Sequence, residues 1–375
     1  MRRAGKGGAG KVVTQHRFSR DLDWTLLLLT LVICALGILQ IYSATIGTVW
    51  KHDWWKQTLY ILAGLAIMNL VARIDYHALL EHVPVFYVVS LVTLILVLVL
   101  GRQVFGSRRW VPLPGGFTLQ VSEFAKLVIV LLAARYLSEL KSDRPDFRDL
   151  LKLGGLVALP MILVLKQPAL GTALTYVVIT AGMIFVAGLR WQHAVAIGLV
   201  LALVLPVGWM FLKDYQRARL TAFQDLERDP LGSGYQVIQS KIAVGSGGMW
   251  GKGVTRGSQA RLRFLPVAHT DFILSAFAEE HGFVGVAVVL GLYFLMLMQI
   301  VQNAQVAPDR AGMYICMGVG ALLLFHVLVN VGMLVGRMPV TGLPLPLMSY
   351  GGSSVLTMFM MLGLVNNVRL QRFVN

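Results

Sequence analysis

The sequence predicts an all-α integral membrane protein with about ten transmembrane helices. Of its 375 residues, 57% are hydrophobic and only 14% are charged, whereas soluble domains carry about 25% charged residues. The apolar residues gather into blocks close to the ~20 residues that cross a bilayer as a helix. These blocks are continuously apolar, while the strands of a membrane barrel would alternate apolar and polar residues.

Ten apolar segments are the predicted spans, and the fifth of them is the shortest. They are residues 24–44, 56–72, 81–100, 122–138, 153–166, 170–188, 192–212, 282–302, 311–333 and 351–368. The first segment is longer than the apolar part of a signal peptide and lacks a small-residue cleavage site, so we expect it to be retained. The prediction is one membrane domain, 24–370, between a basic tail, 1–23, and a short tail, 371–375.

The distribution of basic residues predicts the orientation. Before the first span the chain carries Arg2, Arg3, Lys6, Lys11, Arg17 and Arg20, and basic flanks stay in the cytoplasm. Ten spans then return the C-terminus, with Arg369 and Arg372, to the cytoplasmic side. The loops predicted to lie outside are 45–55, 101–121, 214–281 and 334–350.

The net charge of +15 has two interpretations. Binding to nucleic acid requires a basic patch on a soluble surface, and this chain offers no soluble domain to carry one. Attraction to anionic lipid headgroups is the favoured interpretation. Cys34 and Cys316 both fall inside apolar spans, so we expect buried thiols rather than a disulfide or a metal site.

The loop of residues 214–281, between the seventh and eighth spans, is long, polar and rich in glycine. Loops longer than about 12–15 residues are usually functional or disordered, and the apolar residues interspersed here indicate a folded loop. Its Gly245–Gly253 stretch resembles a phosphate-binding loop but has Ser246 and Gly253 where that motif needs glycine and Ser or Thr. The glycines are therefore predicted to permit tight turns and close packing.

Charged residues near the outer ends of spans are candidates for a site. Glu123 and Lys126 are three positions apart, so they share one helix face. Ionisable groups within a span are costly and usually functional, although a neutralised structural pair is the competing interpretation. Arg109 in the preceding loop could join them, and Arg with Lys would suit a phosphate-bearing ligand.

Asp271 is the sharpest candidate for catalysis. It stands where the polar loop re-enters an apolar segment, and partial burial would make its carboxylate a better general base. A residue at the start of a helix is the alternative, because Asp favours N-caps and first turns. His269, two residues earlier, is interpreted from position alone as a hydrogen-bonding loop residue, and no ligand spacing for zinc is present.

A series of motifs resembles the SEDS (shape, elongation, division and sporulation) family of peptidoglycan glycan polymerases, over nearly the whole chain. The motifs are Ile41-Tyr-Ser-Ala-Thr45, Arg109-Trp110, Ser122-Glu123 with Lys126, Gly171-Thr172, Gly234-Tyr-Gln-Val-Ile-Gln-Ser240, Gly245-Ser-Gly-Gly248, Phe264-Leu-Pro266, His269-Thr-Asp-Phe-Ile273, Thr341-Gly-Leu-Pro-Leu-Pro346 and Ser349-Tyr-Gly-Gly-Ser-Ser354. The early Tyr-Ser-Ala and the short tails are more similar to the RodA (elongation) branch than to the FtsW (division) branch.

The resemblance implies a polymerase of lipid II in the bacterial cytoplasmic (inner) membrane, with its active site on the extracytoplasmic face. It implies Asp271 as the general base in an inverting glycosyl transfer. The implied substrate-binding residues are Arg109, Glu123, Lys126, His269, Thr270, Ser349 and Ser353. It further implies a class B penicillin-binding protein as partner, beside lipid II, the nascent glycan strand and membrane lipids. No protein-bound cofactor is implied, and a divalent cation (Mg²⁺ or Mn²⁺) would sit on the substrate pyrophosphate.

Three positions depart from the family pattern. Ala169 stands where the family commonly has Asp, Val121 where it has Pro, and Val267 where it often has an acidic residue. Two functions of other classes stay open at this point. One is a lipid II flippase or transporter, which would need a polar path across the membrane. The other is a non-catalytic scaffold of an elongation or division complex, which loss of carboxylates such as that at Ala169 would favour.

Overall fold

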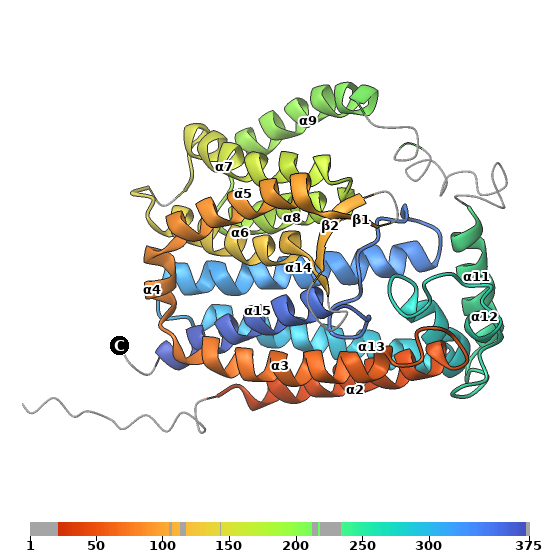
Figure 1. Cartoon of the computed structure of the whole chain (residues 1–375). Coiled ribbons are helices and arrows are strands. Elements are labelled where there is room, and N and C mark those ends of the chain that lie inside the picture. Colours follow the sequence, from red (N-terminus) through yellow and green to blue (C-terminus); the bar gives the residue numbers. More distant parts are fainter. Residues whose placement is uncertain are drawn as a thin grey trace, which may run out of the picture.

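The computed structural model describes residues 22–104, 107–112, 118–142, 144–211, 217 and 234–372. Over these residues it is a bundle of long helices with a small sheet at one edge (Figure 1). The elements in chain order are α2 Trp24–Thr45, α3 Asp53–Arg73, α4 Tyr76–Glu81, α5 Val83–Leu100, β1 Arg102–Val104, β2 Ser107–Pro112, β3 Thr118–Leu119, α6 Val121–Ser138, α7 Phe147–Lys166, α8 Leu170–Val186, α9 Trp191–Phe211, α11 Tyr235–Gly247, α12 Ser258–Arg261, α13 Ile273–Gln305, α14 Arg310–Leu334 and α15 Gly352–Gln371.

The predicted helical fold is confirmed, and each of the ten predicted spans overlaps a helix. Five helices among the described residues are long and apolar enough to cross a membrane, namely α2, α5, α13, α14 and α15. The full count of ten spans and their orientation stay predictions. The basic N-terminal tail lies outside the described residues up to position 21, and the last three residues of the C-terminal tail lie outside them as well.

Aspartates begin several helices. The side chain of Asp23 accepts a hydrogen bond from Leu26 N, and that of Asp309 accepts one from Gly312 N. Such caps satisfy N–H groups that the first turn of a helix leaves unpaired. Asp23 also lies 3.3 Å from Arg369 of α15. The start of α2 and the end of α15 therefore meet at one end of the bundle.

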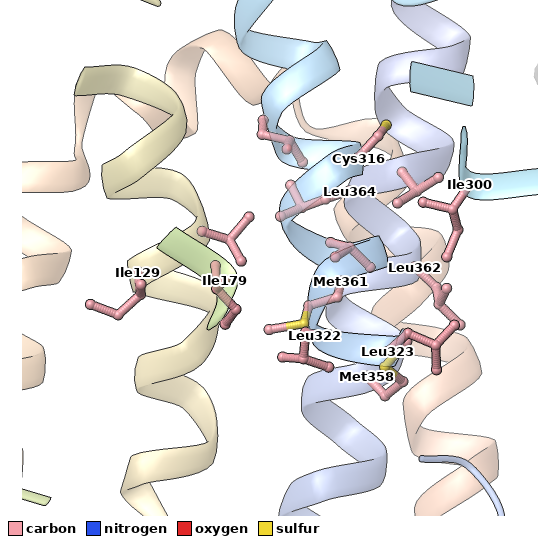
Figure 2. Packing of buried hydrophobic residues seen from close by; sticks show 14 of the residues in the cluster. Ile129, Ile179, Ile300, Cys316, Leu322, Leu323, Met358, Met361, Leu362 and Leu364 are labelled. Carbon is pink, nitrogen blue, oxygen red and sulfur yellow. The ribbon is translucent and has the colours of Figure 1, made fainter. Parts of the chain in front are cut away.

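Helix α14 lies at the centre of the bundle and packs against α6, α8, α13 and α15. Figure 2 shows Leu322 of α14 next to Met361 of α15, with Ile179 of α8 and Ile129 of α6 to one side of them. Helices at the periphery of the bundle are less buried. Only 17% of the apolar stretch of α5 is buried, compared with 61% of that of α14. Exposed apolar side chains on outer helices are what a protein surrounded by lipid requires.

The polar loop folds around a kink in α13. At Gly282 the backbone has φ 67°, a value that side-chain-bearing residues rarely adopt. A Cβ at this glycine would lie 2.5 Å from Met249 O. Phe283 N and Val284 N, freed by the kink, donate to Gly248 O and Met249 O. The glycine-rich turn after α11 thus pairs with the backbone that the kink exposes, which confirms the predicted packing role of these glycines.

Two features were not predicted. Residues 101–121 carry a three-stranded antiparallel sheet, β1-β2-β3, so the chain is not purely α-helical. The loop 214–281 also contains the helices α11 and α12 and the first turns of α13. Residues 214–216 and 218–233 of this loop lie outside the described part of the chain. Cys34 and Cys316 are buried free thiols, as predicted.

Candidate active site

Two loops are joined by hydrogen bonds directly before α13. The hydroxyl of Ser349 donates to the carbonyl oxygen of Thr270 at 2.7 Å and accepts from Leu345 N at 2.9 Å. Tyr350 N donates to the carbonyl oxygen of His269 at 3.0 Å. The 335–351 segment is therefore bound to the turn that carries Asp271, toward the end of the bundle where α11 and α12 lie (Figure 1).

A third loop reaches the start of α15, directly after this segment. Gln120 N, at the end of the small sheet, donates to the hydroxyl of Ser353 at 2.8 Å. Gln57 of α3 donates from Nε2 to Ser349 O at 3.0 Å and accepts from Gly351 N. The described parts of the loops 101–121, 214–281 and 334–350 are thus joined by hydrogen bonds, and residues 349–353 are the point where they meet.

Asp271 is partly buried in the turn that precedes α13. Phe272, rather than Asp271, occupies the N-cap position of this helix. The Nδ2 of Asn330 donates to the carbonyl oxygen of Asp271 at 3.1 Å. A Cβ built on Gly342 would lie 3.7 Å from Asp271 Oδ2, so the carboxylate lies against the glycine of the Thr341–Pro346 motif.

His269 lines the inner side of this turn. Its Nε2 lies 3.8 Å from Asp53 Oδ2, and its ring centroid lies 5.1 Å from that of Trp50 and 5.7 Å from that of Tyr350. Burial lowers the pKa of His269, and the carboxylate of Asp53 opposes this shift. A neutral imidazole packed between aromatic rings fits the interpretation of His269 as a structural loop residue.

Glu123 and Lys126 form a buried ion pair within α6. Lys126 Nζ lies 2.7 Å from Glu123 Oε1, and the side chains are 1% and 6% exposed. The cavity beside them is also lined by His326, Ser354 and Thr357 and has a volume of about 10 Å³, room for about one water molecule. The pair is therefore enclosed. Pro346, from the segment that packs on Asp271, also lines this cavity.

Arg109 lies on β2, partly buried. This strand packs against α5 and α6 and pairs with β3 in the register Val111↔Leu119. Arg109 is thus held by the sheet that leads directly into the helix of Glu123. The strand of Arg109 therefore contacts the helix that carries the ion pair.

Two polar residues of α14 were missed by the sequence interpretation. His326 donates from Nδ1 to Pro344 O at 3.1 Å, and its Nε2 lies 3.4 Å from Lys126 Nζ. Asn330 donates to Leu343 O at 3.2 Å and to Asp271 O. Both residues are buried within an apolar helix, and their spacing of four residues puts them on one face. The rule that intramembrane polar residues mark function would have found them.

Ala169 occupies the N-cap of α8 without a side-chain hydrogen bond. The next turn of this helix borders the site, because a Cβ on Gly171 would lie 2.8 Å from Thr341 O. The missing carboxylate is therefore at a helix start beside the Thr341–Pro346 motif. With Ala169 at this position, the first turn of α8 has no side-chain cap.

Comparison with known proteins gives one consistent family. The family model for FtsW, RodA and SpoVE, described as a cell cycle protein, matches residues 23–373. The peptidoglycan glycosyltransferase MrdB of Escherichia coli K12 is 36% identical over 352 residues, which cover 94% of each chain.

Two solved structures are similar over the same extent. One belongs to work described as "Structural coordination of polymerization and crosslinking by a peptidoglycan synthase complex", with a TM-score of 0.80, 37% identity, and coverage of 94% of this chain and 99% of that one. The other is RodA of Thermus thermophilus, with a TM-score of 0.70, 32% identity, and coverage of 94% and 98%. The choice between the elongation and division branches stays a prediction. The chain belongs to the FtsW/RodA/SpoVE family.

Proposed function

We propose that this chain is a peptidoglycan glycosyltransferase that polymerises lipid II into glycan strands during cell-wall elongation. MrdB of Escherichia coli, which matches nearly the whole chain, carries the name of this enzyme class. The single observation that carries the proposal is the position of Asp271. It is a partly buried carboxylate at the junction of the outer loops, with its backbone held by Asn330.

In this reaction Asp271 acts as the general base. Its carboxylate takes the proton of the acceptor sugar hydroxyl as the oxygen attacks the anomeric carbon of the lipid-linked donor. The new C–O bond forms as the bond from the anomeric carbon to the pyrophosphate oxygen breaks, and polyprenyl pyrophosphate leaves as the anion. A single in-line displacement of this kind inverts the anomeric centre.

The other site residues support this step. Arg109 offers a bidentate fork for the leaving pyrophosphate. Glu123 and Lys126 are enclosed. We therefore propose that they set the electrostatic field near the site and support the Pro344–Pro346 segment. Ser349 and Ser353 bind the loops to one another, and His269 and Thr270 shape the turn that presents Asp271.

A divalent cation would be held by the substrate pyrophosphate. Among the described residues there is no group of three or more His, Cys, Asp and Glu side chains that could hold a metal ion. Mg²⁺ or Mn²⁺ enters the proposal only as a counter-ion of the substrate.

The membrane arrangement and partner are part of the same proposal. Ten spans with both termini in the cytoplasm would place Asp271 on the extracytoplasmic face of the inner membrane, where lipid II polymerisation occurs. One similar structure is described as a complex that combines polymerisation with crosslinking. This supports a class B penicillin-binding protein as the partner that supplies the crosslinking activity.

The proposal is tested by polymerisation of purified lipid II by the reconstituted chain with its partner. We expect glycan strands from the wild type and none from Asp271→Ala. Glu139→Ala is the matched control, because this exposed carboxylate lies at the far end of α6. Polymer formed by Asp271→Ala at the wild-type rate would overturn the assignment. Lipid II translocation without polymer would favour the flippase, and neither activity would favour the scaffold.

A further inference from the structure

His326 stands at the contact between α14, α6 and the 335–351 segment. Its side chain is fully buried, with the residue 1% exposed. The carbonyl oxygen of Pro344 can only accept a hydrogen bond, so Nδ1 of His326 carries the proton that is donated at 3.1 Å. The ammonium of Lys126 can only donate, so Nε2 is the acceptor at 3.4 Å. Both neighbours thus select the same neutral tautomer.

Lys126 needs this acceptor because it is buried. Its ammonium has one carboxylate partner, Glu123, at 2.7 Å. A buried charge is costly unless further hydrogen bonds satisfy it. The neighbouring cavity of about 10 Å³ is lined by Thr357, whose buried hydroxyl has no hydrogen-bond partner among the described residues. The flexible lysine stem could move into this space if the imidazole were absent.

The same face of α14 also carries the contact to Asp271. Asn330, one turn after His326, donates to the carbonyl oxygens of Leu343 and Asp271. Leu343 and Pro344 are consecutive, so the side chains of Asn330 and His326 donate hydrogen bonds to adjacent carbonyl oxygens of one segment. The ion pair of α6 and the turn of Asp271 are thereby connected through a single strip of α14.

We infer that His326 is a positioning residue, which fixes the ammonium of Lys126 and ties it to the Leu343–Pro344 segment that packs on Asp271. The inference rests on the proposed polymerase function for its catalytic consequence. The hydrogen-bonded link itself is independent of that function. Small displacements of a catalytic arrangement cost about 100-fold in rate, so loss of the link should lower kcat more than it changes KM for lipid II.

The kinetic test compares three substitutions in the reconstituted full chain with its partner. His326→Leu removes the hydrogen bonds to Pro344 O and Lys126 Nζ and the 3.5 Å contact with Thr175 Oγ1, and we expect kcat to fall by about 10- to 100-fold, with KM within about threefold. His326→Gln can donate to Pro344 O and accept from Lys126, so it should restore most of the rate. Thr180→Val is the matched control, because its hydroxyl donates to Tyr176 O within α8 and makes no contact with His326 among the described residues. Wild-type kcat in His326→Leu would overturn the inference.

A second measurement does not depend on activity. In the ¹⁵N spectrum of histidine-labelled protein, the His326 signals are assigned by their loss in His326→Gln. Lys126→Met should shift the Nε2 resonance of His326 and leave its donating Nδ1–H in place. An unchanged Nε2 resonance would overturn the positioning role, whatever the enzyme does. If Lys126→Met shifts the resonance but the wild-type chain makes no polymer, the proposed function alone would be overturned.

Discussion

Asn330 contacts the main chain of Asp271: its side-chain Nδ2 donates a hydrogen bond of 3.1 Å to the carbonyl oxygen of Asp271. The same amide donates to Leu343 O at 3.2 Å. This contact uses neither oxygen of the carboxylate. It fixes the turn before α13 against the Thr341–Pro346 motif and so determines where a base at Asp271 can act.

Asn330→Asp should separate the turn from this motif. The substitution keeps the size of the side chain but removes the donor, which leaves two carbonyl oxygens without their partner. Loss of a buried donor costs about 1–3 kcal/mol, and we expect kcat to fall by about 100-fold through misplacement of the base. Thr180→Val serves as control, since its hydroxyl bonds only within α8. Unchanged kcat in Asn330→Asp would show that the bond does not position Asp271.

The buried ion pair should respond differently to one substitution than to two. Lys126→Met leaves Glu123 charged and buried, which should cost about 3–5 kcal/mol of stability. Lys126→Met with Glu123→Leu should recover most of this loss, because no charge is then left without a partner. Glu139→Gln, which breaks the exposed pair with Arg135, should cost at most about 1 kcal/mol. Thermal unfolding in detergent measures all three, and equal losses in the single and double variants would contradict this account.

Two adjacent glutamates give a second contrast in stability. Glu279 accepts hydrogen bonds from Lys252 Nζ at 2.6 Å and from Ser258 N at 2.8 Å, so Glu279→Gln should destabilise the loop.

Burial raises the pKa of Glu280, and the hydrogen bond from Ser43 opposes this shift. A raised pKa means that the folded state favours the protonated form, and the stability gained from it is lost as pH rises above 4.5. Glu280→Gln should therefore raise the melting temperature at pH 7.5 and have little effect near pH 4. A lower melting temperature at pH 7.5 would be the opposite result.

His269 should make the chain sensitive to acid. Burial lowers its pKa below the usual 6.5, so the unfolded state binds its proton more readily than the folded state. The stabilisation is present above pH 6.5 and is lost as pH falls through and below that value. His269→Gln should flatten the decline of melting temperature between about pH 7 and 5.5. The exposed His82→Gln is the control, and equal slopes in wild type and His269→Gln would contradict the prediction.

The helices could be predicted because lipid leaves few alternatives. Long apolar runs such as 311–333 can hardly be anything but helices, and α14 covers that range as Arg310–Leu334. The sheet at residues 102–119 was missed because its strands are short and depend on packing against α5 and α6. The first turns of α13 were missed because their continuity with a span depends on the Gly282 kink, which hydrogen bonds to residues 248 and 249 stabilise.

The site could be predicted in part. The sequence predicted the loops of Thr270 and Ser349 to lie on one side of the membrane, and a hydrogen bond joins these two residues. The enclosure of Lys126 did not follow, because it depends on how closely α14 and α15 pack on α6. His326 and Asn330 lay inside a stretch interpreted as apolar, so their roles became visible only with the partners across the bundle.

The most direct test of the account is Asp271→Asn, which keeps the shape of the side chain and removes its basicity. We expect the variant to bind lipid II within about threefold of the wild-type Kd, and its single-turnover polymerisation rate to fall by about 10²–10⁴-fold, as loss of a general base implies. Intact binding with that loss of rate would support Asp271 as the base. Polymerisation by Asp271→Asn at a rate close to the wild type would contradict it.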